Sequence, residues 1–134
     1  MNRRSRHSGF SLVEVVVVVA IIGILAAVTV PMVGDLNETA KKEKAHRNAQ
    51  NIAQVSSALG TLGVAHVMPD SLGGVKATAR LLREGVTISD GPLQGSLFIV
   101  PSLSNEEIDY AATYLSVVYD LNEIRLEYAG PNDA

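Results

Sequence analysis

The chain has 134 residues, 47% of them hydrophobic and 19% charged, with a net charge of −3 and no cysteine. That length is typical of one domain, and the lack of cysteine excludes the disulfides that often stabilise small secreted domains. The acidic balance argues against a nucleic-acid partner, because such binding depends on neutralising phosphates with basic side chains.

A long apolar segment dominates the first third of the chain. Residues 15–34 contain no charged side chain. Every side chain in this range is apolar apart from Gly23, Thr29, Pro31 and Gly34. As a helix, the apolar stretch of residues 10–33 reaches about 36 Å, which exceeds the hydrocarbon thickness of about 30 Å. Because a lone segment in lipid must satisfy its backbone groups internally, we predict a membrane-spanning helix.

Basic residues precede this segment and set its orientation. Arg3, Arg4 and Arg6, together with His7, lie on its N-terminal side. The positive-inside rule places that end in the cytoplasm. The rest of the chain is then expected outside the membrane, in a single-pass arrangement.

A secretory signal peptide or a plain membrane anchor would be the simplest explanation of these features. A signal peptide ends in small residues with an A-x-A-like pattern, but Ala26 and Ala27 lie inside an apolar run that continues through Val30. Neither explanation accounts for Glu14, an acidic residue at the start of the apolar run. An unpaired charge there is costly, so Glu14 needs a partner.

The residues from position 9 to 14, Gly-Phe-Ser-Leu-Val-Glu, resemble the N-terminus of type IV pilins and of the pseudopilins of type II secretion systems. The resemblance covers residues 3–36. In that family a prepilin peptidase cuts a basic leader after a glycine at the cytoplasmic face, and the exposed residue, usually phenylalanine, is N-methylated. Gly9 and Phe10 occupy those two positions.

Three further positions match the family pattern. The family has a glutamate one helical turn after the new N-terminus, and Glu14 stands at that position. The family helix also carries a glycine and a proline that allow local bending or melting during assembly. Gly23 and Pro31 occupy those places.

The resemblance implies a structural subunit and no enzyme. Such a prepilin is processed at Gly9-Phe10, inserted in the bacterial inner membrane with its headgroup in the periplasm or outside the cell, and assembled through its N-terminal helix into a helical filament. The implied partners are prepilin peptidase, the inner-membrane assembly platform, further copies of the chain and other pilins or pseudopilins, with no cofactor and no nucleic acid. Major pilin, minor pilin and pseudopilin all fit, and the compact headgroup without cysteines favours a pseudopilin-like subunit. The alternative is a membrane-anchored extracytoplasmic binding or enzymatic domain with an uncleaved anchor.

The chemistry of positions 10 and 14 supports this interpretation. Cleavage after Gly9 exposes an α-amino group whose reference pKa is about 8, so Phe10 carries a positive charge near neutrality. Glu14 follows by about one helical turn and lies at a similar depth in the membrane. The Glu14 carboxylate of one subunit can therefore neutralise the Phe10 ammonium of a neighbour and fix their register. Snorkelling of Glu14 to the membrane interface is the alternative.

The helix is expected to continue beyond the membrane. Residues 35–59 contain no proline or glycine, and apolar residues recur at helical spacing, namely Ala45, Ala49, Ile52, Val55 and Leu59. Gly60 and Gly63 then supply stop signals. We predict one helix over residues 10–59. The chain then divides into a leader (1–9), a transmembrane half of this helix (10–34), an extracytoplasmic half (35–60) and a headgroup (61–134).

The headgroup pattern predicts a small α+β, pilin-like arrangement. A short helix is expected over residues 75–84, ending at Gly85, and a second one begins at the S-x-x-E capping box of Ser104 and Glu107. Strands are expected at residues 86–89, 97–100, 114–119 and 123–128, the last two forming a hairpin. An antiparallel sheet packed on the outer half of the long helix would bury both apolar faces.

No catalytic constellation is evident. His7, His46 and His66 are scattered, and His66 with Asp70 is the only suggestive pair, which we interpret as a packed or surface histidine. Asp120, Asn122 and Glu123 offer oxygen ligands near the predicted hairpin, but such clusters usually form only a turn. We therefore predict no catalytic, cofactor-binding or metal-ligating residue.

Overall fold

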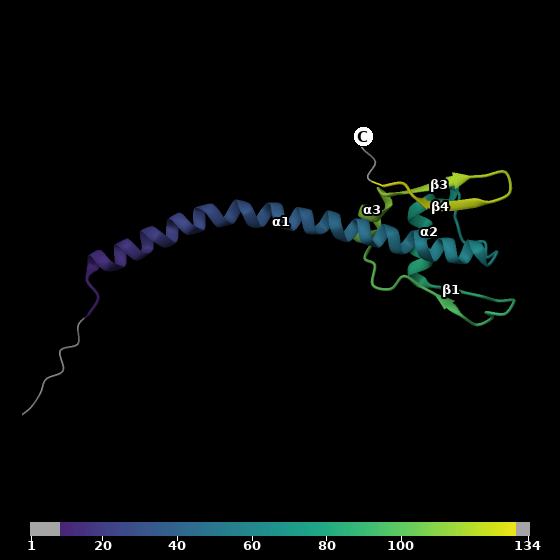
Figure 1. The fold of residues 1–134 in the computed structure, drawn as a ribbon, viewed down its shortest axis with the longest axis horizontal. Helices are drawn as coiled ribbons and strands as arrows, with labels where there is room; N and C mark the ends of the chain where they lie inside the picture. Colours follow the sequence, from purple (N-terminus) through teal and green to yellow (C-terminus); the bar gives the residue numbers. More distant parts are fainter. Residues whose placement is uncertain (1–8, 131–134) are drawn as a thin grey trace, which may run out of the picture. The chain divides into compact units, whose positions relative to one another are not determined.

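The computed structural model describes residues 9–130, without the side chains of residues 31 and 32. Its elements are α1 (Leu12–Thr61), η1 (Asp70–Leu72), α2 (Gly74–Glu84), β1 (Val86–Thr87), β2 (Leu97–Phe98), α3 (Asn105–Ala112), β3 (Leu115–Tyr119) and β4 (Ile124–Tyr128) (Figure 1). The chain divides into two compact units, Met1–Thr39 and Ala40–Ala134, called here the N-terminal unit and the C-terminal unit. The residues predicted to set the membrane orientation, Arg3, Arg4, Arg6 and His7, lie outside the described range.

Helix α1 confirms the predicted long helix, with its ends two residues later than expected. In the N-terminal unit every described side chain of residues 9–39 is exposed. The most apolar window of α1 has a mean hydropathy of 2.9, and α1 is the one helix among the described residues that is long and apolar enough to cross a membrane. A helix that is apolar on all sides is suited to lipid.

Thr29 is the polar side chain in the middle of this apolar run. Its hydroxyl donates to the carbonyl oxygen of Leu25 at 2.7 Å. Because a polar group in hydrocarbon is costly unless it is hydrogen-bonded, this bond lets the threonine lie in lipid.

Helix α1 ends in a Schellman motif at the predicted glycines. The N–H of Val64 donates to the carbonyl of Leu59 at 3.0 Å, and that of Gly63 donates to the carbonyl of Gly60 at 2.9 Å. Gly63 has a φ of 72°, the left-handed conformation this motif needs. Leu59 is fully buried, and Val64 packs against the same core, which supplies the apolar contact that accompanies the motif.

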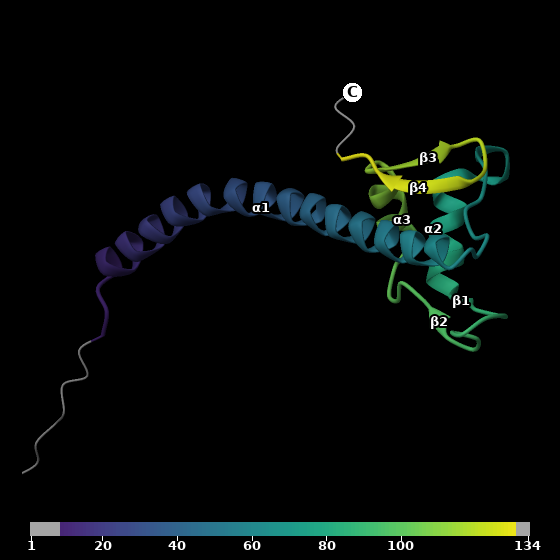
Figure 2. The same cartoon turned by 45° about the vertical axis from the view of Figure 1, so that its right-hand side comes forward.

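The core of the C-terminal unit lies between the outer half of α1, the helices α2 and α3, and the β3–β4 pair (Figure 2). The predicted apolar face of α1 is confirmed: Ala45, Ala49, Ile52 and Leu59 are buried, and Val55 is half-buried. The other buried core residues are Ala79, Leu82, Val100, Leu103, Ile108, Ala111, Leu115 and Leu126. The outer half of α1 is therefore an integral part of the headgroup core.

Both short helices form where the sequence places them. α2 ends at Gly85, whose φ is 98° and whose N–H donates to the carbonyl of Leu81. At α3 the Ser104 hydroxyl accepts from the N–H of Glu107 at 3.1 Å, and the Ser104 N–H donates to the Glu107 carboxylate at 2.7 Å. The predicted capping box is thus confirmed in full.

The α+β fold class is also confirmed, but the four strands form two separate antiparallel pairs, β1–β2 and β3–β4. The first pair is shorter than predicted. Val100 leaves the ladder because its N–H donates to the carbonyl of Leu82 in α2, at 2.9 Å. After β1, Ile88 exchanges hydrogen bonds with Ser96 and Gly95, which close the β1–β2 connection.

The Lys44–Glu107 ion pair joins α1 to α3 and predicts an acid-sensitive contact. The hydrogen bond from Lys44, helped by the Ser104 N–H, lowers the pKa of Glu107. A carboxylate with a lowered pKa stabilises the fold above its unfolded pKa of about 4.3, and this contribution is lost as pH falls through the folded value. We expect the free energy of unfolding to fall less steeply below about pH 4.3 in Glu107→Gln than in wild type, measured by denaturant titration. Glu106→Gln, an exposed neighbour, is the control and should follow wild type; equal slopes in all three proteins would contradict the prediction.

Candidate functional site

The candidate site is the start of α1, where Gly9 and Phe10 precede the helix and Glu14 lies in its first turn. Phe10 is 87% exposed, so its ring has no packing role within the described chain. Phe10 and Glu14 border one hollow of about 610 Å³, together with valines of the first two turns. The aromatic ring and the carboxylate therefore lie beside the same apolar surface.

Glu14 forms a second capping box, which the sequence analysis missed. The Ser11 N–H donates to Oε2 of Glu14 at 2.9 Å, and the Glu14 N–H donates to the Ser11 hydroxyl at 3.2 Å. The signal was the same S-x-x-E spacing that identified Ser104 and Glu107. An acidic side chain here is also favoured by the positive end of the helix dipole.

The capping box gives Glu14 a partner inside its own chain. Only Oε2 takes part, and Oε1 accepts no hydrogen bond from any residue in the 9–130 range. Phe10 is still joined to Gly9 by a peptide bond in this chain and so carries no ammonium. One carboxylate oxygen thus remains available for a group from outside the chain.

Gly9 and Gly23 have no structural reason to be glycine. A Cβ at either position would meet no described atom within 4 Å, and neither residue adopts a positive φ. Glycine inside a helix costs up to about 1 kcal/mol relative to alanine. The folded chain itself therefore does not require these glycines, whereas Gly63 and Gly85 hold backbone conformations that favour glycine.

His66 is packed, as predicted, and is not paired with Asp70. Its Nε2 lies 2.6 Å from the Ser56 hydroxyl and its Nδ1 lies 2.7 Å from the carbonyl of Val64. Asp70 instead binds Tyr119: its N–H donates to the tyrosine oxygen at 2.8 Å, and the tyrosine hydroxyl donates to Oδ2 at 2.9 Å. Both residues thus stabilise connections within the C-terminal unit.

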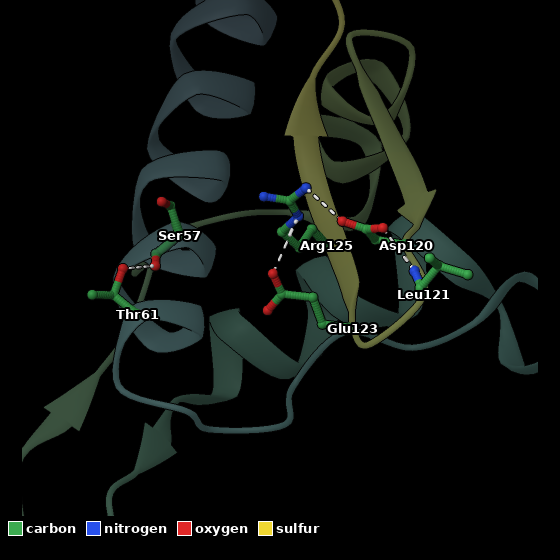
Figure 3. Close-up of polar contacts among 6 residues, drawn as sticks. All are labelled: Ser57, Thr61, Asp120, Leu121, Glu123 and Arg125. Atoms are coloured by element: carbon green, nitrogen blue, oxygen red, sulfur yellow. Dashed lines mark hydrogen bonds and ion pairs between the residues drawn. The ribbon is translucent and has the colours of Figure 1, made fainter.

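The acidic residues of the β3–β4 turn are engaged by Arg125. Its guanidinium lies 3.4 Å from the Asp120 carboxylate and 3.6 Å from that of Glu123 (Figure 3). The other Asp120 oxygen accepts from the N–H of Leu121 at 2.7 Å. Over the part of the chain that is described, no group of three or more His, Cys, Asp or Glu side chains is placed to hold a metal ion.

Comparison with known proteins identifies the N-terminal segment. A family model described as the prokaryotic N-terminal methylation motif matches residues 4–30. No curated protein and no solved structure matches the chain. The match includes Gly9, Phe10 and Glu14, and it confirms the resemblance drawn from those residues.

Proposed function

We propose that this chain, which carries the N-terminal methylation motif that is the hallmark of type IV pilin and pseudopilin precursors, is a structural subunit of a type IV pilus-like or type II secretion filament. Its N-terminal helix inserts in the inner membrane, with the N-terminus in the cytoplasm and the C-terminal unit on the far side. Prepilin peptidase removes residues 1–9, and the subunit then joins a filament through α1. It acts by assembly, not by catalysis.

The observation that carries this proposal is the position of the matched motif. Residues 4–30 include the start of the membrane-length helix α1. A signal peptide or an ordinary anchor needs neither a capped glutamate in the first turn nor a glycine that the fold does not require. Both features are accounted for if outside partners recognise them.

Gly9 is assigned to the peptidase. Since the described chain leaves open space around this residue, we attribute the glycine to the enzyme that must bind the extended backbone on either side of the scissile bond. Cleavage removes Arg3, Arg4 and Arg6 and changes the net charge from −3 to −6. The new N-terminus is Phe10, which is then N-methylated.

Glu14 is assigned to assembly. After cleavage the Phe10 ammonium stands one residue before Ser11, the N-cap of α1. When helices of neighbouring subunits pack, the ammonium of one subunit meets the free Oε1 of Glu14 in the next, and both charges are neutralised. Loss of one partner from a buried pair costs about 3 to 5 kcal/mol, so the pair fixes the register between subunits.

The remaining partners follow from the route to the filament. The subunit contacts the inner-membrane assembly platform when it leaves the bilayer, and it packs against further copies or other pilins and pseudopilins in the fibre.

The proposal is tested by shearing filaments from cells that express the tagged chain and measuring its share in the filament fraction. We expect the chain in that fraction only when a prepilin peptidase is present. A chain that stays in the membrane fraction under both conditions would contradict the proposal.

Gly23 and Pro31 are assigned to helix flexibility in the filament. α1 is helical across both positions, as a helix in lipid should be. In a filament, neighbouring helices can satisfy freed carbonyls, so residues 23–31 can extend. Glycine destabilises a helix by up to about 1 kcal/mol relative to alanine, and proline in a helix interior by about 3 kcal/mol. The double variant Gly23→Ala with Pro31→Ala removes both costs. We expect normal insertion and processing but an altered rise or elasticity of the fibre.

Cryo-electron microscopy of filaments checks this assignment. Wild-type filaments should show a break in the helix between residues 23 and 31, and filaments of the double variant should show a longer helical run. Gly60→Ala is the matched control, since Gly60 also has open space around it but lies outside the apolar segment. An unbroken helix over residues 10–59 in wild-type filaments would refute the assignment.

A further inference from the structure

Among residues 9–130 the β3–β4 sheet has two strands, so the outer edge of β4 carries no partner strand there. The N–H of Asp120 donates to the carbonyl of Glu123, and the N–H of Ala129 donates to the carbonyl of Tyr114, both at 2.9 Å. Hydrogen-bonded residues alternate along an antiparallel strand, so the backbone groups of Ile124 and Leu126 point away from β3. Within residues 9–130 the N–H and carbonyl groups of Ile124 and Leu126 take part in no other hydrogen bond.

A cleft of about 710 Å³ lies along this edge. Its opposite wall is formed by the last turns of α1, including Ser57 and Thr61, and the segment of residues 63–67 closes one end (Figure 3). The Thr61 hydroxyl donates to the carbonyl of Ser57 at 2.9 Å, so it is used within α1. Leu126 is only 4% exposed, so its side chain belongs to the core, and the residue also lines this cleft.

The size of the cleft suits one short strand. Strands lie about 4.8 Å apart, sheets pack about 10 Å apart and the rise is about 3.4 Å per residue, which gives about 160 Å³ for each residue. The cleft thus has room for about four residues in extended conformation. It does not have room for a two-stranded sheet.

The charges along the outer edge of β4 indicate which kind of strand would bind there. Residues 120–127 contain three carboxylates, Asp120, Glu123 and Glu127, against Arg125 alone. Arg125 is shared between Asp120 and Glu123, whereas Glu127 makes no ion pair with a described residue. A lysine or arginine on an added strand opposite Glu127 would form a favourable cross-strand pair.

A second copy of the chain does not offer such a strand. Residues 85–124 contain no lysine or arginine. Apart from Arg125, every lysine and arginine of the C-terminal unit lies on α1 or α2. Arg125 belongs to β4, which already carries β3 as a second strand.

We infer that the cleft between β4 and the end of α1 binds a short extended segment of a different protein, which adds as a strand to β4 and places a basic residue opposite Glu127. Backbone hydrogen bonds to Ile124 and Leu126 provide the affinity in this mode, and the side chains that alternate along the segment provide the selectivity. The site lies in the C-terminal unit and is independent of processing at Gly9.

The test uses NMR titration of the full-length protein in detergent micelles with the peptide acetyl-Lys-Val-Thr-Val-amide. In an antiparallel strand its lysine lies opposite Glu127 and its two valines lie opposite Leu126 and Ile124. We expect saturable shifts of the Ile124 and Leu126 amides. N-methylating its two valine amides should abolish them, and replacing the peptide lysine by glutamate should weaken binding about three- to tenfold. Glu127→Lys should weaken binding about three- to tenfold, and the control Glu106→Lys, an exposed carboxylate on α3, should not.

Equal binding of the lysine, glutamate and N-methylated peptides would overturn the inference, as would shifts confined to residues that do not line the cleft. A concentration-dependent dimer that shifts the same amides without peptide would assign the edge to a second copy and also overturn it. Processing at Gly9 and filament incorporation of Glu127→Lys are measured in parallel and separate this site from assembly through α1. We expect normal processing and normal incorporation together with weakened peptide binding.

Discussion

Glu14→Leu is expected to insert in the membrane at least as well as wild type and yet to be absent from filaments. Removing a charge from the apolar run favours insertion by up to about 3 kcal/mol. In a filament the variant leaves the Phe10 ammonium of a neighbour without its carboxylate, which costs about 3 to 5 kcal/mol when the charge is buried. The measurement is the share of tagged subunit in sheared filaments relative to the membrane fraction. Folding of the C-terminal unit should not change.

Ser11→Ala is the matched control for this prediction. It removes the hydroxyl that caps α1, at a cost of about 1 kcal/mol, but it keeps both the Glu14 carboxylate and the Ser11 N–H that binds it. We therefore expect Ser11→Ala to enter filaments. Equal incorporation of wild type and Glu14→Leu would show that the charge has no role in assembly, and equal loss in Ser11→Ala and Glu14→Leu would assign that role to the helix cap.

Ile52→Ala is expected to destabilise the C-terminal unit strongly. Ile52 is fully buried and packs in the core that α1 shares with the headgroup. Such truncations cost about 2 to 5 kcal/mol, a large part of the stability of a unit of this size. The midpoint of thermal unfolding should fall by about 10 °C or more.

Near-UV circular dichroism of the full chain in micelles measures this effect selectively. All four tyrosines lie between residues 110 and 128, so the signal reports the C-terminal unit. Gln54→Ala, an exposed position two residues away on the same helix, should melt with wild type. A midpoint for Ile52→Ala as high as that of Gln54→Ala would mean that α1 does not share the headgroup core.

The sequence predicted the features that depend on local pattern. The apolar period of α1, the glycine stop signals and the capping box at Ser104 each result from contacts within a few residues, and all three are present. The capping box at Ser11 is equally local, and the S-x-x-E spacing of Ser11 and Glu14 predicts it. The charge of Glu14 in an apolar run obscures this second role of its carboxylate.

Features that depend on distant residues could not be read in this way. The early end of the β1–β2 ladder depends on the hydrogen bond from the Val100 N–H to the Leu82 carbonyl, and the position of η1 depends on Tyr119, 49 residues from Asp70. Nothing near His66 shows that Ser56 is its partner. The open edge of β4 likewise follows from the ladder register, which only the folded chain reveals.

The N-terminal residue of the protein extracted from membranes tests the central claim most directly. In cells that contain a prepilin peptidase, mass spectrometry should find a chain that begins at N-methylated Phe10, and Gly9→Val should remain uncut because a branched side chain crowds the peptidase cleft. Cells without the peptidase should yield the chain from Met1. An intact Met1 terminus in the wild-type protein, in cells that contain the peptidase, would contradict the account and would favour an extracytoplasmic domain on an uncleaved anchor.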